Sequence, residues 1–162
     1  MTVLVAFASR HGSTREIAEF IAETLRGSGT EADCVQVEMA PDPRRYEGVV
    51  LGSAVYVGSW LPEATAFARG NAEDLTGRPV WLFSSGPFGT PVLDEEEQPM
   101  ELEELRNRIS PREHRLFYGA LHMDKLSFEE RMVVKAMGAP AGDFRDWDDI
   151  RSWTEGIASS FA

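Results

Sequence analysis

The stretch that decides the fold reads Thr2-Val-Leu-Val-Ala-Phe-Ala8, followed directly by Ser9-Arg-His-Gly-Ser-Thr14. An almost uninterrupted apolar, β-rich run is typical of a strand covered on both faces, and such strands lie in the middle of parallel sheets. From Ile17 to Leu25, apolar residues recur at the spacing of one helical face. The stretch therefore predicts a central strand, a short polar loop and a helix.

The start of this helix carries a second signal. Ser13 and Glu16 have the spacing of a capping box, in which each side chain bonds the backbone of the other residue. Gly27 and Gly29 follow the last apolar residue and predict the helix end. We therefore expect Ser13 to cap the helix.

The rest of the chain alternates in the same way. Further β-rich apolar runs predict strands at residues 33–38, 48–54, 79–83 and 115–121. Helical spacing returns after Pro62, around Met100 to Ile109, and in two C-terminal segments capped by Ser127 and Asp146. Strands that alternate with helices form βαβ units, whose right-handed crossovers give a parallel sheet. The order of elements predicts a doubly wound α/β fold with five strands.

Composition sets the broad class. The chain has 162 residues, 43% of them hydrophobic, which fits a single domain over residues 1–162. A formal net charge of −11 argues against nucleic-acid binding, which depends on Lys and Arg. Cys34 is the single cysteine, and no Cys/His cluster has metal-ligand spacing. No apolar run approaches the roughly 20 residues of a transmembrane helix, and no basic leader opens the chain. We expect a cytoplasmic protein.

A ligand of such a sheet lies beyond the carboxyl ends of the strands. The loops at that edge are residues 9–14, 55–61, 84–90 and 122–127. The first loop joins a buried strand to a helix, and its backbone N–H groups and hydroxyls suit one phosphate group. It has neither the triphosphate-loop pattern nor the G-x-G-x-x-G of dinucleotide binders. An ordinary helix cap explains the same residues equally well.

Two other loops carry aromatic residues beside glycines. Tyr56 and Trp60 flank Gly58, and Phe88 lies between Gly86 and Gly89. Large rings next to backbone that allows close approach suit a flat heteroaromatic ligand. Taken singly, each ring is at least as well explained by packing on the core.

Together these loops resemble those of a known family. Residues 3–18 are similar to the first strand and FMN phosphate loop of flavodoxin-like proteins, whose loop pattern is roughly [S/T]-x-T-G-x-T. Ser9, Gly12 and Thr14 match it, and His11 replaces a Thr. Arg10 and Arg15 add positive charge to a loop that is usually neutral. The resemblance implies a flavodoxin-like five-stranded parallel sheet, order 2-1-3-4-5, with helices on both faces and FMN as cofactor.

A narrower resemblance extends along the chain. Leu51-Gly-Ser-Ala-Val-Tyr-Val-Gly-Ser-Trp60, residues 127–137 and Asp146-Trp147 resemble the flavodoxin-domain group that includes menaquinone-dependent protoporphyrinogen oxidase. Residues 85–113 depart from that group, because an acidic run, Asp94-Glu-Glu-Glu97, replaces the basic loop expected there. The resemblance therefore leaves oxidase activity open.

The resemblance also implies the site residues, as three sets. The phosphate would be held by Ser9, Arg10, His11, Gly12, Ser13 and Thr14. One side of the isoalloxazine ring would be lined by Ala54, Val55, Tyr56, Val57 and Gly58, with Tyr56 or Trp60 near it. The other edge would be covered by Ser85, Gly86, Pro87, Phe88 and Gly89. In such proteins a backbone carbonyl turns toward flavin N5 on reduction, and Gly58 is the residue that allows this at low cost.

The function expected is electron transfer through bound FMN, with a redox partner protein or a small acceptor such as a quinone. No protein acid, base, nucleophile or metal is required, because the flavin carries the chemistry. The alternatives are a quinone-linked protoporphyrinogen oxidase-like flavoenzyme and a non-redox module on the same scaffold. Peripheral membrane contact and the oligomeric state stay open.

Overall fold

The sheet has the strand order expected. The computed structural model describes residues 2–10, 12–56, 58–86, 99–121, 127–137, 142–143 and 145–161. Its main sheet consists of β1 (Thr2–Ala8), β2 (Glu31–Gln36), β3 (Gly48–Tyr56), β5 (Val80–Ser85) and β6 (Glu113–Phe117). These strands are parallel in the order β2-β1-β3-β5-β6, which confirms the predicted order 2-1-3-4-5. A short β4 (Ser59–Trp60) adds antiparallel to the end of β3.

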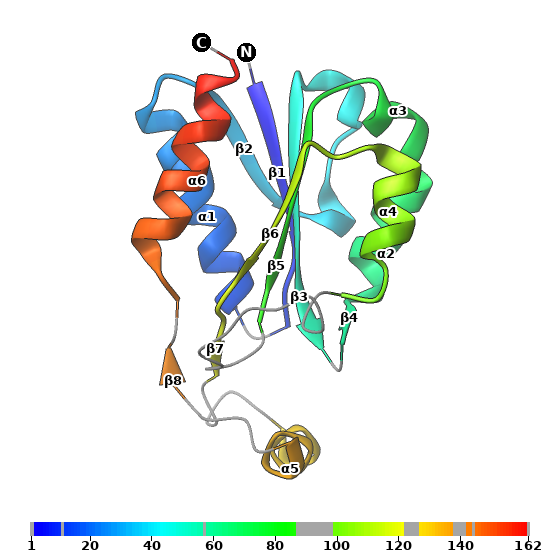
Figure 1. Ribbon diagram of the computed structural model, residues 1–162, viewed down its shortest axis with the longest axis vertical. Helices are drawn as coiled ribbons and strands as arrows, with labels where there is room; N and C mark the ends of the chain where they lie inside the picture. Colours follow the sequence, from blue (N-terminus) through cyan, green and yellow to red (C-terminus); the bar gives the residue numbers. More distant parts are fainter. Residues whose placement is uncertain are drawn as a thin grey trace.

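Helices cover both faces of this sheet (Figure 1). One face packs against α1 (Ser13–Gly27) and α6 (Trp147–Ser159). The other face packs against α2 (Pro62–Gly70), α3 (Ala72–Thr76) and α4 (Leu102–Ile109). Short 3-10 turns occupy Val37–Met39 and Pro43–Arg45. The α5 helix (Phe128–Met137) lies apart from these layers, at the end of the sheet where the strands finish (Figure 1).

Strand alternation builds the two cores. In β1, Val3, Val5 and Phe7 belong to the cluster under α1 and α6, while Leu4 and Ala6 belong to the other cluster. This is the period of two that a strand buried on both faces requires. The doubly covered sheet is thus a direct consequence of the opening apolar run.

One glycine of β3 is required by close packing. A Cβ on Gly52 would lie 2.0 Å from the ring of Phe83 on the neighbouring strand β5. Phe83 is fully buried and packs against Phe117 and Trp153. A larger residue at position 52 would therefore displace the aromatic centre of the core.

The fifth predicted strand is divided in the structure. Residues 113–117 form β6 in the sheet, whereas β7 (Ala120–Leu121) leaves it and pairs antiparallel with β8 (Gly142–Asp143). The prediction of one strand over 115–121 was wrong on this point. Gly119 interrupts the apolar run between the two pieces, and the partner of β7 comes from a distant part of the sequence.

The predicted helix caps had different outcomes. Ser127 and Glu130 form the reciprocal capping box of α5, with bonds of 3.1 and 3.2 Å. The Asp146 carboxylate accepts from the backbone N–H of Asp149 and caps α6. The prediction for α1 was wrong, because Gly12 is the N-cap and no side chain caps this helix. Glu16 pairs with Arg145 instead.

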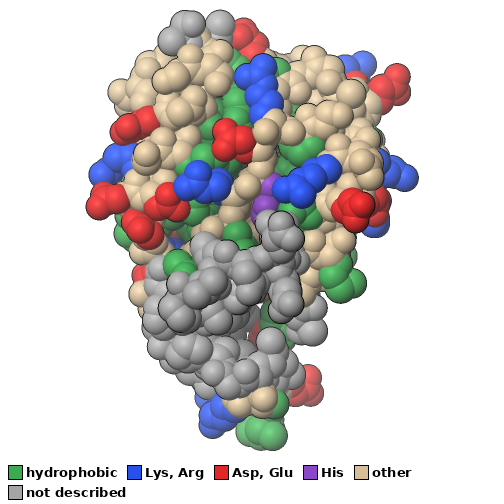
Figure 2. Space-filling model, in the orientation of Figure 1, with side chains coloured by type: hydrophobic (Ala, Val, Ile, Leu, Met, Phe, Trp, Pro, Cys, Tyr) green, Lys and Arg blue, Asp and Glu red, His purple; other side chains and the backbone are tan. Residues whose placement is uncertain are grey.

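The surface carries both signs of charge. On the face shown in Figure 2, basic and acidic side chains are interspersed over the part of the molecule that the structure describes. None of the helices in the described ranges combines the length and the apolar character that a bilayer crossing requires.

Candidate functional site

The crevice between β1 and β3 is the natural place for a ligand. These strands are neighbours and parallel, with Ala8 opposite Ser53. The chain leaves β1 toward α1 on one face and leaves β3 toward α2 on the other. Connections that depart in opposite directions open a crevice beyond the strand ends. The described parts of the first three predicted loops, residues 9–10, 12–14, 55–56, 58–61 and 84–86, lie at this end of the sheet (Figure 1).

The loop between β1 and α1 turns on a glycine. Gly12 has φ 92° and ψ −11°, a left-handed conformation that residues with a side chain rarely adopt. Its N–H donates to Ser9 Oγ at 3.1 Å, and its carbonyl accepts from Glu16 N at 3.0 Å as the helix begins. The N–H groups of the first turn, which have no partner within the helix, face outward from the start of α1. This is the geometry of an anion site.

Thr14 supplies the most informative observation. Its side chain is fully buried, yet its Oγ1 has no hydrogen-bond partner among the described residues. Leaving a buried hydroxyl unpaired costs on the order of 1–3 kcal/mol. Such a group in the first turn of α1 is suited to an acceptor that the described part of the chain does not provide.

The second loop is the hairpin between β3 and β4. Val55 pairs with Trp60 and Tyr56 with Ser59, so the two strands are antiparallel neighbours. Gly58 has φ 77°, as a tight hairpin turn requires. Its carbonyl accepts from the backbone N–H of Met100 at 3.0 Å. The segment before α4 therefore holds the Gly58 carbonyl in a defined orientation.

Trp60 is part of the hydrophobic core. Its side chain is only 3% exposed and packs in the core cluster under α2 and α4. Its Nε1–H donates to Ser84 Oγ at 2.7 Å, and its backbone N–H donates to the Glu101 carboxylate at 3.1 Å. These contacts favour Tyr56, which is half-buried, over Trp60 as the ring available to a ligand.

Ser84 also contacts a histidine. Its Oγ lies 2.7 Å from His114 Nε2 on β6. Burial lowers the pKa of His114 to about 4, with a smaller contribution from the positive charge of Arg106. The imidazole is therefore neutral at pH 7 and can accept a hydrogen bond at Nε2. No sequence pattern indicates this Trp60–Ser84–His114 chain, because its members are 24 and 30 residues apart.

The third loop follows β5. Ser85 is buried, and Gly86 has φ 116°. The Gly86 N–H donates to the Phe117 carbonyl at 2.9 Å, and a Cβ on Gly86 would lie 3.7 Å from the Val55 carbonyl oxygen. The start of the third loop is therefore close to the β3 end of the second loop.

The first and second loops are joined by a cation–π contact. The Arg10 guanidinium carbon lies 5.1 Å from the centre of the Tyr56 ring. The structure thus brings together most of the predicted site residues at one edge: Ser9, Arg10, Gly12, Ser13, Thr14, Ala54, Val55, Tyr56, Gly58, Ser85 and Gly86. Outside the described residues lie His11, Val57, Pro87, Phe88 and Gly89.

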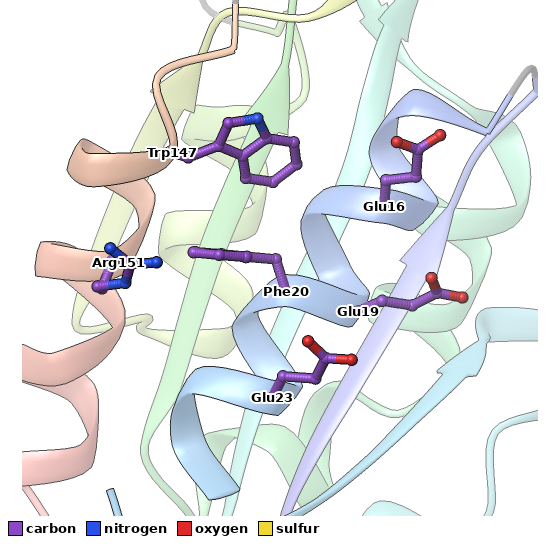
Figure 3. Close-up of a pocket in the computed structure, with 6 residues that line it drawn as sticks. All are labelled: Glu16, Glu19, Phe20, Glu23, Trp147 and Arg151. Carbon is purple, nitrogen blue, oxygen red and sulfur yellow. The ribbon is translucent and has the colours of Figure 1, made fainter. Parts of the chain in front are cut away.

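A separate groove runs between α1 and α6 (Figure 3). It is lined by acidic residues of α1 and by a tilted ring pair, Phe20 and Trp147, whose centres are 4.9 Å apart. Arg151 lies over Phe20 at 5.3 Å, and Arg145 lies over Trp147 at 4.8 Å. These stacked groups hold the two helices together, and the groove is formed by helix sides rather than by strand ends.

Comparison with known proteins agrees with the geometry of the strand ends. A family model described as a flavodoxin domain matches residues 4–148. The chain belongs to the flavodoxin domain family. This confirms the resemblance inferred from the sequence and identifies FMN as the cofactor of the fold. Flavodoxin domains place that cofactor at the strand ends, where the three glycine-containing loops of this chain converge.

Individual relatives are distant but cover the whole fold. Protoporphyrinogen IX dehydrogenase [quinone] from Escherichia coli strain K12 is 24% identical and covers 98% of this chain and 95% of its own length. A flavodoxin from the domain Archaea has a TM-score of 0.67 at 13% identity, covering 99% of this chain and 98% of its own. Rubredoxin oxygen:oxidoreductase from Desulfovibrio gigas has a TM-score of 0.66 at 13% identity over 98% of this chain, which matches 35% of that larger protein.

The described residues fit FMN. The buried, unpaired Thr14 Oγ1 at the start of α1 is a donor of the kind that a phosphate oxygen accepts. Gly12 turns the loop so that backbone N–H groups lie beside it. Among the same residues, no group of three or more His, Cys, Asp or Glu side chains is placed to bind a metal ion.

Proposed function

We propose that this protein is an FMN-binding redox protein that passes electrons through the flavin to a partner protein or a small acceptor. The observation that carries the proposal is the unpaired, fully buried Thr14 hydroxyl in the first turn of α1. Family membership supplies the cofactor class, and the unpaired hydroxyl supports the assignment of the phosphate group to the start of α1. The flavin supplies one-electron and two-electron transfer when it is bound.

In this proposal the first loop holds the phosphate. Thr14 Oγ1 and the N–H groups of the first turn donate to phosphate oxygens, and the positive end of the α1 dipole favours the negative charge. Ser9 Oγ already accepts from Gly12 N, so the Ser9 hydroxyl proton is free to be donated. The residues assigned to the phosphate are Ser9, His11, Gly12, Ser13 and Thr14, with Arg10 contributing only its backbone, because its guanidinium lies over Tyr56.

The other two loops would border the flat ring system. Tyr56 and the backbone at Gly58 lie at the second loop, and Gly86 brings the third loop close to Val55. Positive φ at Gly58 and Gly86 lets both backbones turn sharply without a side chain in the way. The remaining residues assigned to the ring are Ala54, Val57, Trp60, Ser85, Pro87, Phe88 and Gly89.

Removal of the phosphate-loop hydroxyls tests the assignment. We expect Ser9→Ala combined with Thr14→Val to weaken FMN binding by a factor of at least about 100, because two hydrogen bonds to a charged group contribute about 1.5–3 kcal/mol each. Thr14→Val alone should leave the free energy of unfolding of the flavin-free protein unchanged or slightly higher, since it replaces an unpaired buried hydroxyl by a methyl group of similar shape. Fluorescence titration and urea unfolding measure the two quantities.

The matched control is Ser28→Ala at the other end of α1, where Ser28 Oγ bonds the Thr24 carbonyl. It should leave FMN affinity unchanged. Wild-type affinity in the double variant would show that the phosphate is not held by this loop.

A second candidate is a quinone-linked dehydrogenase that acts on protoporphyrinogen. It is favoured by the near full-length similarity to the Escherichia coli protein of that name. Turnover of protoporphyrinogen by the FMN-loaded protein, with a quinone as acceptor, distinguishes the two candidates. If a donor protein reduces the flavin and protoporphyrinogen is not turned over, the quinone-linked dehydrogenase is excluded and only the electron-transfer function is supported.

We also propose that residues 1–162 form a single domain that works in the cytoplasm. The family match over residues 4–148 and the packing of α6 against α1 support one unit. The electron acceptor in this proposal is a quinone or a partner protein.

A further inference from the structure

We propose that Arg10 sets the redox balance of the bound flavin, by holding a positive charge beside the ring system rather than at the phosphate. The inference rests on the proposed function and names a role within that site. It follows from the position of the Arg10 guanidinium over Tyr56, from the charge environment of Arg10, and from the net charge of the chain.

Position is the first argument. Arg10 belongs to the phosphate loop by sequence, but its guanidinium carbon lies 5.1 Å from the centre of the Tyr56 ring at the end of β3. The phosphate-side groups of the loop, Gly12 and Thr14, lie at the start of α1. The Arg10 side chain therefore extends from the first loop toward the second, where the proposed site holds the ring.

The absence of a neutralising partner is the second argument. In the described part of the chain, Arg10 has no carboxylate within ion-pair distance, whereas Arg15 pairs with Glu19 and Arg145 pairs with Glu16 and Asp143. Arg10 is also exposed, so its stacking on Tyr56 is what fixes its direction. A cation that has no carboxylate partner among the described residues, next to a binding site, acts on any charge that develops there.

The charge of the whole chain makes this cation matter. Two-electron reduction of FMN with uptake of one proton adds one negative charge to the ring system. A chain of net charge −11 disfavours that added charge. A guanidinium held over Tyr56, on the ring side of the proposed site, opposes this effect and favours the reduced form over the oxidised form. Arg10 thus raises the midpoint potential relative to the same site without it.

The test compares wild type with Arg10→Gln, Arg10→Lys and Tyr56→Leu. We expect Arg10→Gln to weaken binding of reduced FMN about tenfold more than binding of oxidised FMN, which is a midpoint potential about 30 mV lower for a two-electron couple. Arg10→Lys should restore most of this shift, because it keeps the charge. In the Tyr56→Leu background, Arg10→Gln should shift the potential much less than it does in wild type, because the ring no longer directs the guanidinium.

Riboflavin, which lacks the phosphate, distinguishes the two possible positions of the charge. If Arg10 acts at the ring, Arg10→Gln changes the affinities for FMN and riboflavin by the same factor. The inference is overturned if Arg10→Gln weakens FMN binding alone and leaves the potential unchanged, because Arg10 would then be a phosphate ligand. It is equally overturned if the potential does not move.

Arg15→Gln is the matched control, since Arg15 lies in the adjoining helical turn but is neutralised by Glu19 at 2.9 Å. It should leave the potential within a few millivolts of wild type. A similar shift in Arg15→Gln would contradict the specific role of Arg10. Failure of the wild-type protein to bind FMN would instead refute the proposed function, a result that differs from a loaded protein with an unaltered potential.

Discussion

A single serine, Ser84, connects two parts of the core at the residue scale. It is fully buried, accepts from Trp60 Nε1 and lies 2.7 Å from His114 Nε2. These two contacts connect the β3–β4 hairpin, which carries Gly58, to the edge strand β6. Because His114 is largely removed from water, this connection depends on its staying neutral.

The first prediction concerns pH and His114. Its pKa is near 6.5 in the unfolded chain and about 4 in the folded protein. Between these values the unfolded state takes up a proton that the folded state does not, so the free energy of unfolding falls as the pH is lowered from 6.5 to 4. The slope from this one group is at most about 1.4 kcal/mol per pH unit.

Urea unfolding of wild type and His114→Gln at pH 7, 6 and 5 measures this contribution. The carboxylates titrate in both proteins, so the difference between the two curves isolates His114. We expect the difference in free energy of unfolding between wild type and His114→Gln to shrink steadily as the pH is lowered. A difference that does not change with pH would mean that the pKa of His114 is the same in the folded and unfolded states.

The turns beside the proposed site were predictable from the sequence, but the contacts between their side chains were not. Gly12, Gly58 and Gly86, which have positive φ, were singled out because a glycine between a strand and a helix, or within a turn, is a local signal. Ser13 was wrongly expected to cap α1, since the same pattern describes a cap and an anion site. The Arg10–Tyr56 contact joins residues that are distant in sequence and has no local signature.

Two capped helices differ in what they contribute at the scale of elements. The α6 helix buries Ile150, Trp153 and Ile157 in the core, where Trp153 packs on Phe117 at 5.4 Å between ring centres. The α5 helix exposes Phe128 and Met132, which are 75% and 56% accessible. Both start with a side-chain cap, yet only α6 is part of the main fold.

Removing each cap should therefore have unequal effects. Asp146→Ala removes the bond to Asp149 N and should lower the global free energy of unfolding by about 1 kcal/mol. Ser127→Ala removes the bond from Glu130 N and should fray α5 without a measurable global effect. Urea unfolding followed by tryptophan fluorescence gives the global value, and amide hydrogen exchange reports on α5. Equal global losses in the two variants would show that α5 is packed as firmly as α6.

Helices and strands with a periodic apolar pattern were predictable as elements. The β1, β3 and β5 strands were found because burial on both faces leaves an apolar run. The division of the last strand into β6 and β7 was not predictable. The partner of β7 is β8, some 20 residues further along, and neither segment by itself indicates which strand it pairs with.

The whole molecule combines an acidic chain with the proposed anion site. The fold brings the start of α1, the Gly58 turn and Gly86 to one edge of the sheet, so that local N–H groups and Arg10 act against the unfavourable net charge of −11. The strand order and the two-faced core followed from the sequence because alternation of strands and helices leaves few right-handed arrangements. The central claim is that the start of α1, at this edge of the sheet, binds the phosphate of FMN.

Titration of the flavin-free protein with FMN and with riboflavin tests that claim most directly. Quenching of flavin fluorescence measures both affinities under the same conditions. The account predicts one FMN per chain and an affinity for FMN at least about 100-fold higher than for riboflavin, since the phosphate gains two or more charge-assisted hydrogen bonds. Equal affinities, or no binding of either flavin, would contradict it.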